Sequence, residues 1–220
     1  MKMSTKKLAT LGILGALTIV VNLITVSFNI SLVPAVPFLS YDAKDVIITI
    51  TGFIYGPMAS FILSLVTSTV ELMYNTGHNP IIDLLMNVIS TCSMSCTAAF
   101  IYKKMKSKQG AVIGLITGVV LSTTAMVIWN IIVTPGYYGM PRQAIVELVM
   151  PGFLPFNLIK SGLNASLVLL VYKPIITAFR STLLVEGKGQ KVKYSTGLII
   201  LGLFLVVTII LIILVLNDVI

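Results

Sequence analysis

The sequence predicts an all-α membrane protein, in which one compact bundle of helices crosses the bilayer. Hydrophobic residues make up 57% of its 220 residues and charged residues only 10%, whereas a soluble domain carries about a quarter charged residues. Several apolar stretches reach the ~20 residues that a helix needs to cross a bilayer. These stretches are continuous rather than alternating, which indicates helices and not the strands of a barrel.

The first apolar segment, residues 8–29, follows a basic amino terminus, MKMSTKK. It has no small-residue cleavage site and is longer than the apolar part of a signal peptide, so it is expected to remain as the first helix. A proline-containing loop follows. The second helix is expected to begin near Asp45 and to end before the helix-breaking pair Gly56-Pro57, and the third runs from there to about Tyr74.

Polar or basic stretches separate the remaining apolar segments. The loop NTGHNP precedes a fourth helix, residues 81–102, and the basic segment KKMKSKQG leads to a fifth, residues 111–133. Residues 134–152 are semi-polar and have room for a short interfacial helix before the sixth helix, residues 153–172. A linker rich in glycine and lysine precedes a seventh helix, residues 196–216.

The basic residues predict the orientation, because Lys and Arg gather in the cytoplasmic loops of membrane proteins. The same rule explains the net charge of +8 without nucleic acid. With the amino terminus in the cytoplasm and the carboxyl terminus outside, seven spans leave only Lys44, Arg142 and Lys160 off the cytoplasmic side. Acidic residues then fall at or near the outer ends of helices: Asp42, Asp45, Glu71, Asp83 and Glu147. Asp45 and Asp83 are either ligand contacts or charges that the helix dipole favours.

Lys160 stands out because it lies within an apolar segment. At 1.5 Å per residue it is on the order of 10 Å below the outer surface, where a charge costs ~2.5–3.5 kcal/mol and normally faces a cavity or a partner. Asn157 and Asn164 share its helix face, and Trp129 and Asn130 end the preceding helix. An amine, amides and aromatic rings suit a small, flat, polar molecule. We expect a captured ligand to compensate the burial of Lys160; snorkelling to the surface is the alternative.

Small residues form a stripe on the first helix, where Ala9, Gly12 and Ala16 follow one another at helical spacing. Such a stripe lets another helix approach closely in lipid. Packing within the bundle and docking of an external partner are both open. Cys92 and Cys96, one turn apart in an apolar run, are expected to be packing residues.

No sequence pattern of an enzyme is present. There is no Walker A, HExxH or GxSxG sequence, and no set of acids and histidines is spaced like a metal or acid–base site. The single histidine, His78, lies in a loop. An enzyme is therefore disfavoured, and no cofactor or metal is expected. If the protein moves a solute against a gradient, another subunit must hydrolyse ATP.

Two segments, FLSYDAKDVIITITGFIYGP and GMPRQAIVELVMPGFLPFNLIKSGLNASLVLLVYKP, resemble the substrate-binding S components of energy-coupling factor (ECF) vitamin transporters. The resemblance covers residues 8–180 and is strongest to the riboflavin-specific S components. It implies a six-helix bundle with a vitamin pocket at the outer side, covered by the loop between the first two helices. It also implies a transmembrane coupling subunit and two ATPase subunits as partners.

The resemblance implies roles for individual residues. Asn157 and Lys160 match positions that hydrogen-bond the flavin, Asn130 matches an amide of the preceding helix, and Leu39 and Tyr41 match the lid over the ring. The expected substrate-binding residues are Leu39, Tyr41, Asp45, Asn130, Asn157, Lys160 and Asn164. The expected partner-docking residues are Ala9, Gly12 and Ala16, in place of an AxxxA motif.

The seventh helix departs from this family. The chain is expected to comprise the S-component bundle (residues 1–180), a basic cytoplasmic linker (181–194) and an additional C-terminal transmembrane helix (195–220), which would be a peripheral anchor or would modulate contact with the coupling subunit. The predicted function is riboflavin uptake across a bacterial plasma membrane. Alternatives are an S component for another vitamin or nucleobase-like precursor, a self-sufficient secondary transporter, and a purely structural membrane protein.

Overall fold

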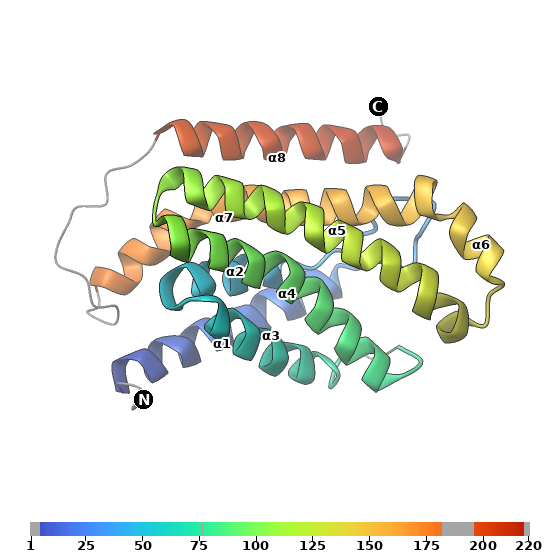
Figure 1. Cartoon of the computed structure of the whole chain (residues 1–220), viewed down its shortest axis with the longest axis horizontal. Coiled ribbons are helices and arrows are strands. Elements are labelled where there is room, and N and C mark those ends of the chain that lie inside the picture. The colour runs from blue at the N-terminus through green and yellow to red at the C-terminus, as the bar shows by residue number, and fades with distance from the viewer. Residues whose placement is uncertain (1–4, 76, 182–195, 218–220) are drawn as a thin grey trace.

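Helices make up nearly all of the computed structural model, which describes residues 5–75, 77–181 and 196–217 (Figure 1). In chain order they are α1 (Thr5–Ser27), α2 (Lys44–Tyr55), α3 (Pro57–Glu71), α4 (Pro80–Met105), α5 (Lys108–Tyr138), α6 (Arg142–Glu147), the π-helix η1 (Val149–Phe153), α7 (Leu154–Ser181) and α8 (Thr196–Leu216). The predicted all-α membrane bundle is confirmed over these residues.

The expected number of seven membrane spans is not confirmed. Among the described residues, five helical segments are long and apolar enough to cross a membrane, namely α1, α4, α5, α8 and the stretch from η1 into α7. Helices α2 and α3 have 12 and 15 residues, which at 1.5 Å per residue gives only ~18 and ~22 Å, against ~30 Å of hydrocarbon. The expectation that each of them forms a full span is therefore not confirmed.

The break between α2 and α3 is at the predicted pair. Gly56 has a φ of 92° and a ψ of 171°, a conformation in the positive-φ range that favours glycine. Pro57 follows as the first residue of α3, where its missing N–H costs no hydrogen bond. The chain reverses here without a long loop.

Helix α2 lies in the centre of the bundle. Ten of its 12 residues are buried, and Ile50 packs in a core cluster with Met94 of α4, Leu115 of α5 and Val168 of α7. A helix that is apolar on nearly every side is typical of such a core position. The bundle therefore closes around a short helix whose amino-terminal end carries Lys44 and Asp45.

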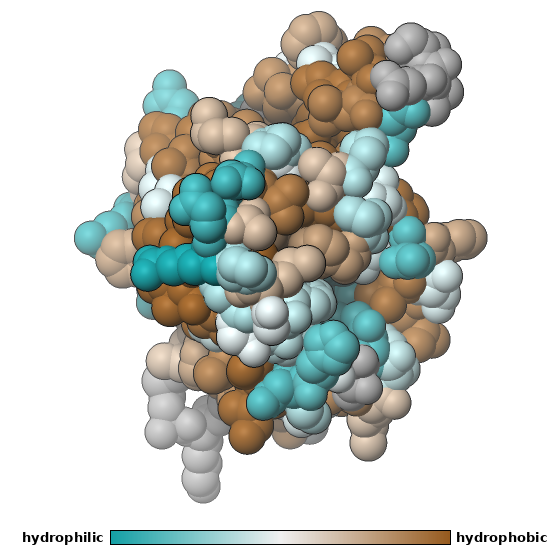
Figure 2. Space-filling model, turned by 90° about the vertical axis from the view of Figure 1, so that its right-hand side faces the viewer, coloured by the Kyte–Doolittle hydropathy of each residue, from teal (hydrophilic) through white to brown (hydrophobic). Residues whose placement is uncertain are grey.

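The two ends of the bundle differ in charge. At one end, the α2–α3 corner lies against Lys103 and Lys106, and the Lys7 ammonium is 5.4 Å from the ring centroid of Tyr55. The other end carries α6 and the loop of residues 28–43. Seen from that end, hydrophilic side chains gather toward the middle among hydrophobic ones (Figure 2).

Helical structure extends beyond two of the expected boundaries. The fifth helix, expected to stop at residue 133, continues through Pro135 to Tyr138. The sixth, expected to begin at residue 153, is preceded directly by the π-helix η1, so that the short interfacial helix α6 leads into α7 almost without a loop. Both differences bring additional side chains to the end of the bundle that carries the loop of residues 28–43.

Candidate functional site

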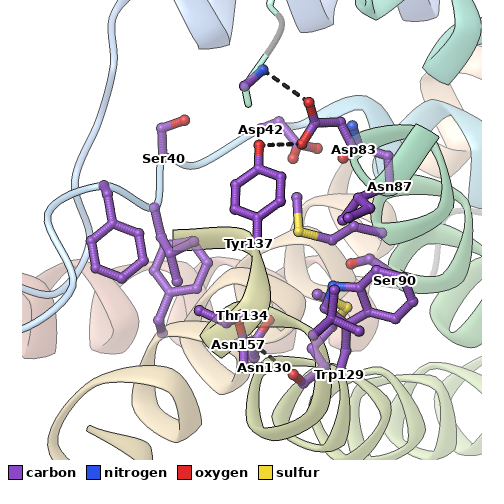
Figure 3. A pocket seen from close by; sticks show the side chains of 18 of the residues that line it. Ser40, Asp42, Asp83, Asn87, Ser90, Trp129, Asn130, Thr134, Tyr137 and Asn157 are labelled. Atoms are coloured by element: carbon purple, nitrogen blue, oxygen red, sulfur yellow. Dashed lines mark hydrogen bonds between the residues drawn. The ribbon is translucent and has the colours of Figure 1, made fainter. Parts of the chain in front are cut away.

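A cavity of about 190 Å³ opens at this end of the bundle, under the loop of residues 28–43 (Figure 3). We call this loop the lid; Tyr41 N–H donates to Ile30 O at 2.9 Å and so closes its base. Four groups of residues provide most of the wall: Phe38, Leu39, Ser40 and Asp42 from the lid, Met86, Asn87 and Ser90 from α4, Met126, Trp129, Asn130, Thr134 and Tyr137 from α5, and Phe156, Asn157 and Lys160 from α7.

The polar stripe of α7 reaches the cavity through Asn157 and Lys160. The Asn157 Nδ2 group donates to Phe153 O at 2.8 Å, which fixes the side chain against η1. Its Oδ1 atom has no hydrogen-bond partner among the residues that the structure describes. π-helical turns are frequent at functional sites. Here η1 holds the side-chain amide of Asn157 at the cavity wall.

Lys160 forms an ion pair with Asp42 of the lid, with 2.6 Å between Nζ and Oδ2. The two side chains are 12% and 8% exposed, so Lys160 does not snorkel to the surface. The prediction that a captured ligand compensates the buried amine named no protein partner, and Asp42 is that partner. Burial opposes the charge of Asp42, yet the ammonium groups of Lys160 and Lys44 hold the pKa of its carboxyl below the usual value.

A second buried ion pair lies beside the cavity, between Lys44 at the start of α2 and Glu71 at the end of α3. Asn87 Oδ1 accepts a further hydrogen bond from Lys44 Nζ at 3.1 Å. Glu71 and Asn87 both line the cavity. The acids at the outer helix ends were predicted from the sequence, but these pairings were not. The feature of the sequence that could have predicted these ion pairs is that its few basic residues outside the cytoplasmic side fall at the same helix ends as its acidic residues.

Three expected substrate-binding residues lie behind the cavity wall instead of lining it. Tyr41 O–H donates to Asn164 Oδ1 at 2.7 Å, and Asn164 Nδ2 donates to Asp42 O at 3.2 Å. Asp45 Oδ1 accepts a hydrogen bond from Thr91 at 2.7 Å. Tyr41 and Asn164 thus join the lid to α7, and Asp45 joins α2 to α4. The other four, Leu39, Asn130, Asn157 and Lys160, line the cavity.

Tyr137, which sequence analysis missed, ties the loop before α4 to the end of α5 (Figure 3). Its hydroxyl donates to Asp83 Oδ1 at 2.5 Å and accepts from His78 N–H at 2.8 Å. Asp83 Oδ2 accepts from Gly77 N–H at 2.9 Å. Asp83 thus has specific partners beyond the helix dipole. We call this set, Gly77, His78, Asp83 and Tyr137, the latch.

Aromatic and sulfur-containing side chains make the apolar part of the wall, including Trp129, Phe156 and Met126. Asn130 is fixed among them, because its Nδ2 donates to Met126 O at 2.7 Å and its Oδ1 accepts from Thr134 at 2.9 Å. Flat apolar surfaces next to oriented amides are suited to a planar molecule with polar edges.

The small-residue stripe of α1 is on the outside of the bundle. Ala9, Gly12 and Ala16 are all exposed, and a Cβ atom at Gly12 would have no heavy atom within 4 Å. Helix α1 packs inward through other residues, among them Leu14 and Thr18. The stripe is therefore not used for packing within the described part of the bundle.

The remaining expectations concern metals and cysteines. Within the described ranges no group of His, Cys, Asp and Glu is arranged to hold a metal ion. Cys92 and Cys96 are free thiols of intermediate burial, and the Cys96 thiol lies 3.6 Å from Pro57 O. They contribute to the contact between α3 and α4.

Known proteins share this sequence and fold. The model of the family described as ECF transporter, substrate-specific component, matches residues 6–172. The riboflavin transporter RibU of Staphylococcus aureus is 29% identical over 174 residues, which cover 76% of this chain and 89% of that protein. The riboflavin transporter FmnP of Bacillus subtilis is 27% identical over 191 residues, or 81% and 98%. A solved S component of a bacterial ECF transporter matches with a TM-score of 0.67 and 28% identity, covering 81% of this chain and 99% of that one.

Proposed function

This chain belongs to the substrate-specific components of ECF transporters, and we propose that it is a riboflavin-binding member. It would capture the vitamin in the cavity under the lid and deliver it inward with a coupling subunit and two ATPase subunits. Two relatives that match over most of their length are riboflavin transporters. As a transporter component it is not an enzyme, and riboflavin is its cargo, not a cofactor.

The observation that carries this proposal is the composition of the cavity wall. Riboflavin is a flat tricyclic ring with polar edges and a polyhydroxyl chain. Trp129 and Phe156 offer flat apolar faces, while Asn157 and Lys160 offer polar groups from α7. Asp42 Oδ1 is buried without a hydrogen-bond partner in the described structure, and a donor from the ligand would satisfy it, as buried polar groups require.

Membrane orientation and partner docking follow from the placement of charges and small residues. The chain is a multi-pass plasma-membrane protein; the lysine-rich end would face the cytoplasm and the cavity the outside. The amino terminus would then be cytoplasmic and the carboxyl terminus extracellular. Ala9, Gly12 and Ala16, exposed on α1, would receive a helix of the coupling subunit.

The absorption spectrum of the detergent-purified chain tests the substrate. Protein from riboflavin-containing medium should be yellow, and riboflavin added to ligand-free protein should quench the emission of Trp129. A colourless preparation that gives no heat on titration with riboflavin would refute the substrate. Mass spectrometry of material released from the protein then shows whether the site holds another vitamin or nucleobase-like precursor or is empty. Flux into liposomes that contain this chain alone would indicate a secondary transporter instead.

A further inference from the structure

Helix α8 is packed closely against α7 and runs antiparallel to it. A Cβ atom at Gly202 would lie 2.9 Å from the Leu170 side chain and 3.2 Å from Ser166 O. Further along α8, Ile209 Cδ1 lies 3.5 Å from the Cβ position of Gly162. The contact therefore extends along α7 from Gly162 to Leu170. In Figure 1, α8 and α1 occupy opposite edges of the bundle.

This contact begins two residues after Lys160, the last residue of α7 that lines the cavity, and lies on another side of the helix. Gly162, Ser166 and Leu170 are spaced four residues apart and form one stripe. Lys160 precedes Gly162 by two residues, which corresponds to ~200° around the helix. Lys160 faces the cavity, so the stripe that meets α8 faces the opposite way.

The second half of α8 also reaches the hydrophobic cluster under the lid. Ile209 and Ile213 pack against a core that contains Phe153, Phe156 and Tyr41. Phe156 lines the cavity, and Tyr41 joins the lid to α7 through its hydrogen bond with Asn164. Helix α8 therefore contacts the structures that hold both the binding helix and the lid.

Close packing is what holds α8 in place. It is apolar on every side, with a mean hydropathy of 3.6 over its most apolar stretch and only 6% of that stretch buried. Lipid tails are as apolar as such a helix, so the hydrophobic effect does not drive its association. The small residues Gly162, Ser166 and Gly202 instead let the two backbones approach and gain van der Waals contact.

We propose that α8 is a supporting helix of the substrate site, and that Gly202, Gly162 and Ser166 are positioning residues that keep Asn157 and Lys160 in register with the lid. The inference rests on the proposed riboflavin function. The family match ends at residue 172, so this support is an addition to the matched region. Loosening α8 would let α7 move away from the lid and would release the ligand faster.

The test uses the full-length chain with Gly202→Leu, which places a side chain against Leu170 and Ser166. Gly197→Leu is the matched control, because a Cβ atom at this exposed α8 position has no neighbour within 4 Å. The measurement is the dissociation rate of riboflavin, followed by recovery of Trp129 emission, together with the visible spectrum of the bound flavin. We expect Gly202→Leu to raise the rate about tenfold and to change the spectrum, and Gly197→Leu to do neither.

Two further variants separate positioning from misfolding. Adding Leu170→Ala to Gly202→Leu restores space and should return the rate toward that of the unmodified protein. Ile209→Ala removes a contact without overpacking and should also raise the rate, whereas Ile210→Ala, at a position that is 45% exposed, should not. Equal rates in Ile209→Ala, Ile210→Ala and the unmodified protein would overturn the inference while leaving the riboflavin function intact. An unmodified protein that binds no riboflavin would overturn both.

Discussion

Lys160 of α7 and Asp42 of the lid form a nearly buried ion pair, with 2.6 Å between Nζ and Oδ2. The pair joins the lid to the helix that supplies the polar side of the cavity. Asn164 strengthens the same junction through Asp42 O and the hydroxyl of Tyr41. A movement of the lid and a change at the binding helix are therefore physically linked, and a ligand that contacts both would stabilise the closed arrangement.

Replacing Lys160 with alanine should weaken riboflavin binding by ~1–3 kcal/mol, because Asp42 and the bound riboflavin lose the ammonium group as a hydrogen-bond donor. Titration of Trp129 emission measures the affinity. Lys103→Ala is the control, since Lys103 is exposed at the opposite end of the bundle. An affinity that stays unchanged in Lys160→Ala would remove this amine from the site.

Replacing Asp42 with asparagine should lower the thermal stability of the ligand-free protein, because the ammonium of Lys160 remains buried without its carboxylate. The loss expected for such a broken pair is ~3–5 kcal/mol. Thermal unfolding in detergent measures it, and adding Lys160→Met should recover part of the loss. If the two substitutions instead destabilise additively, the ion pair is not what couples them.

The same carboxyl predicts the direction of a pH dependence. Its pKa in the folded protein lies below the usual 3.8, so the stability from this group is fully present above its unfolded pKa. It is lost as the pH falls through the lowered value. Unfolding measured between neutral and mildly acidic pH should show no step from Asp42, and the difference between the unmodified protein and Asp42→Asn should shrink only in strong acid.

The sequence was sufficient for features that depend on local pattern. The Gly56-Pro57 break follows from a helix-breaking pair, and the small-residue stripe of α1 follows from spacing along one helix. The burial of Lys160 was predicted, but its partner was not, because Asp42 is 118 residues away in the chain and the pairing depends on how the lid folds over α7.

Two features could not be predicted because tertiary contacts override local signals. Pro135 is a residue that commonly ends a helix, yet α5 continues to Tyr138, and the hydroxyl of Tyr137 is held there by Asp83 and the His78 N–H group. Residues 45–55 are apolar like a membrane span, yet they form a short core helix. Apolar composition alone does not separate burial in protein from burial in lipid.

Because the small-residue stripe of α1 is exposed, a substitution in it should affect assembly with the coupling subunit but not the binding of riboflavin. Gly12→Leu should impair co-purification with the coupling subunit, because the added side chain prevents close approach of a second helix. Riboflavin affinity should remain unchanged, since Gly12 is remote from the residues that line the cavity. Gly197→Leu on α8 is the control for adding leucine to a lipid-facing surface. Normal assembly of Gly12→Leu would place the docking surface elsewhere.

Asp42, Glu71 and Asp83 all lie at the cavity wall, where Lys160 pairs with Asp42 and the neighbouring Lys44 pairs with Glu71. Asp83 has no cationic partner within 4 Å among the described residues. A phosphorylated flavin should therefore bind more weakly than riboflavin, by roughly 15- to 30-fold for one added charge near 8–10 Å at an effective dielectric constant of 20.

Asp83→Asn should reduce the preference for riboflavin over its phosphate ester. Glu147→Gln, which changes an exposed acid on α6, should leave this preference unchanged. Competition titrations with riboflavin and its phosphate ester give the ratio of affinities in each variant. A ratio that Asp83→Asn leaves unaltered would mean that this carboxylate does not contribute to ligand choice.

Tyr137→Phe should open the latch, since it removes one hydroxyl that serves both Asp83 and the His78 N–H group. Riboflavin should then associate and dissociate faster, because the loop before α4 loses its attachment to the end of α5 at the cavity. Tyr138→Phe is a matched control: this neighbouring hydroxyl makes no hydrogen bond in the described structure, although its ring packs on His78. Stopped-flow measurement of Trp129 emission gives both rate constants. Identical rates in the two variants would show that the loop does not limit ligand exchange, and a slower association in Tyr137→Phe would mean that the hydroxyl guides riboflavin inward.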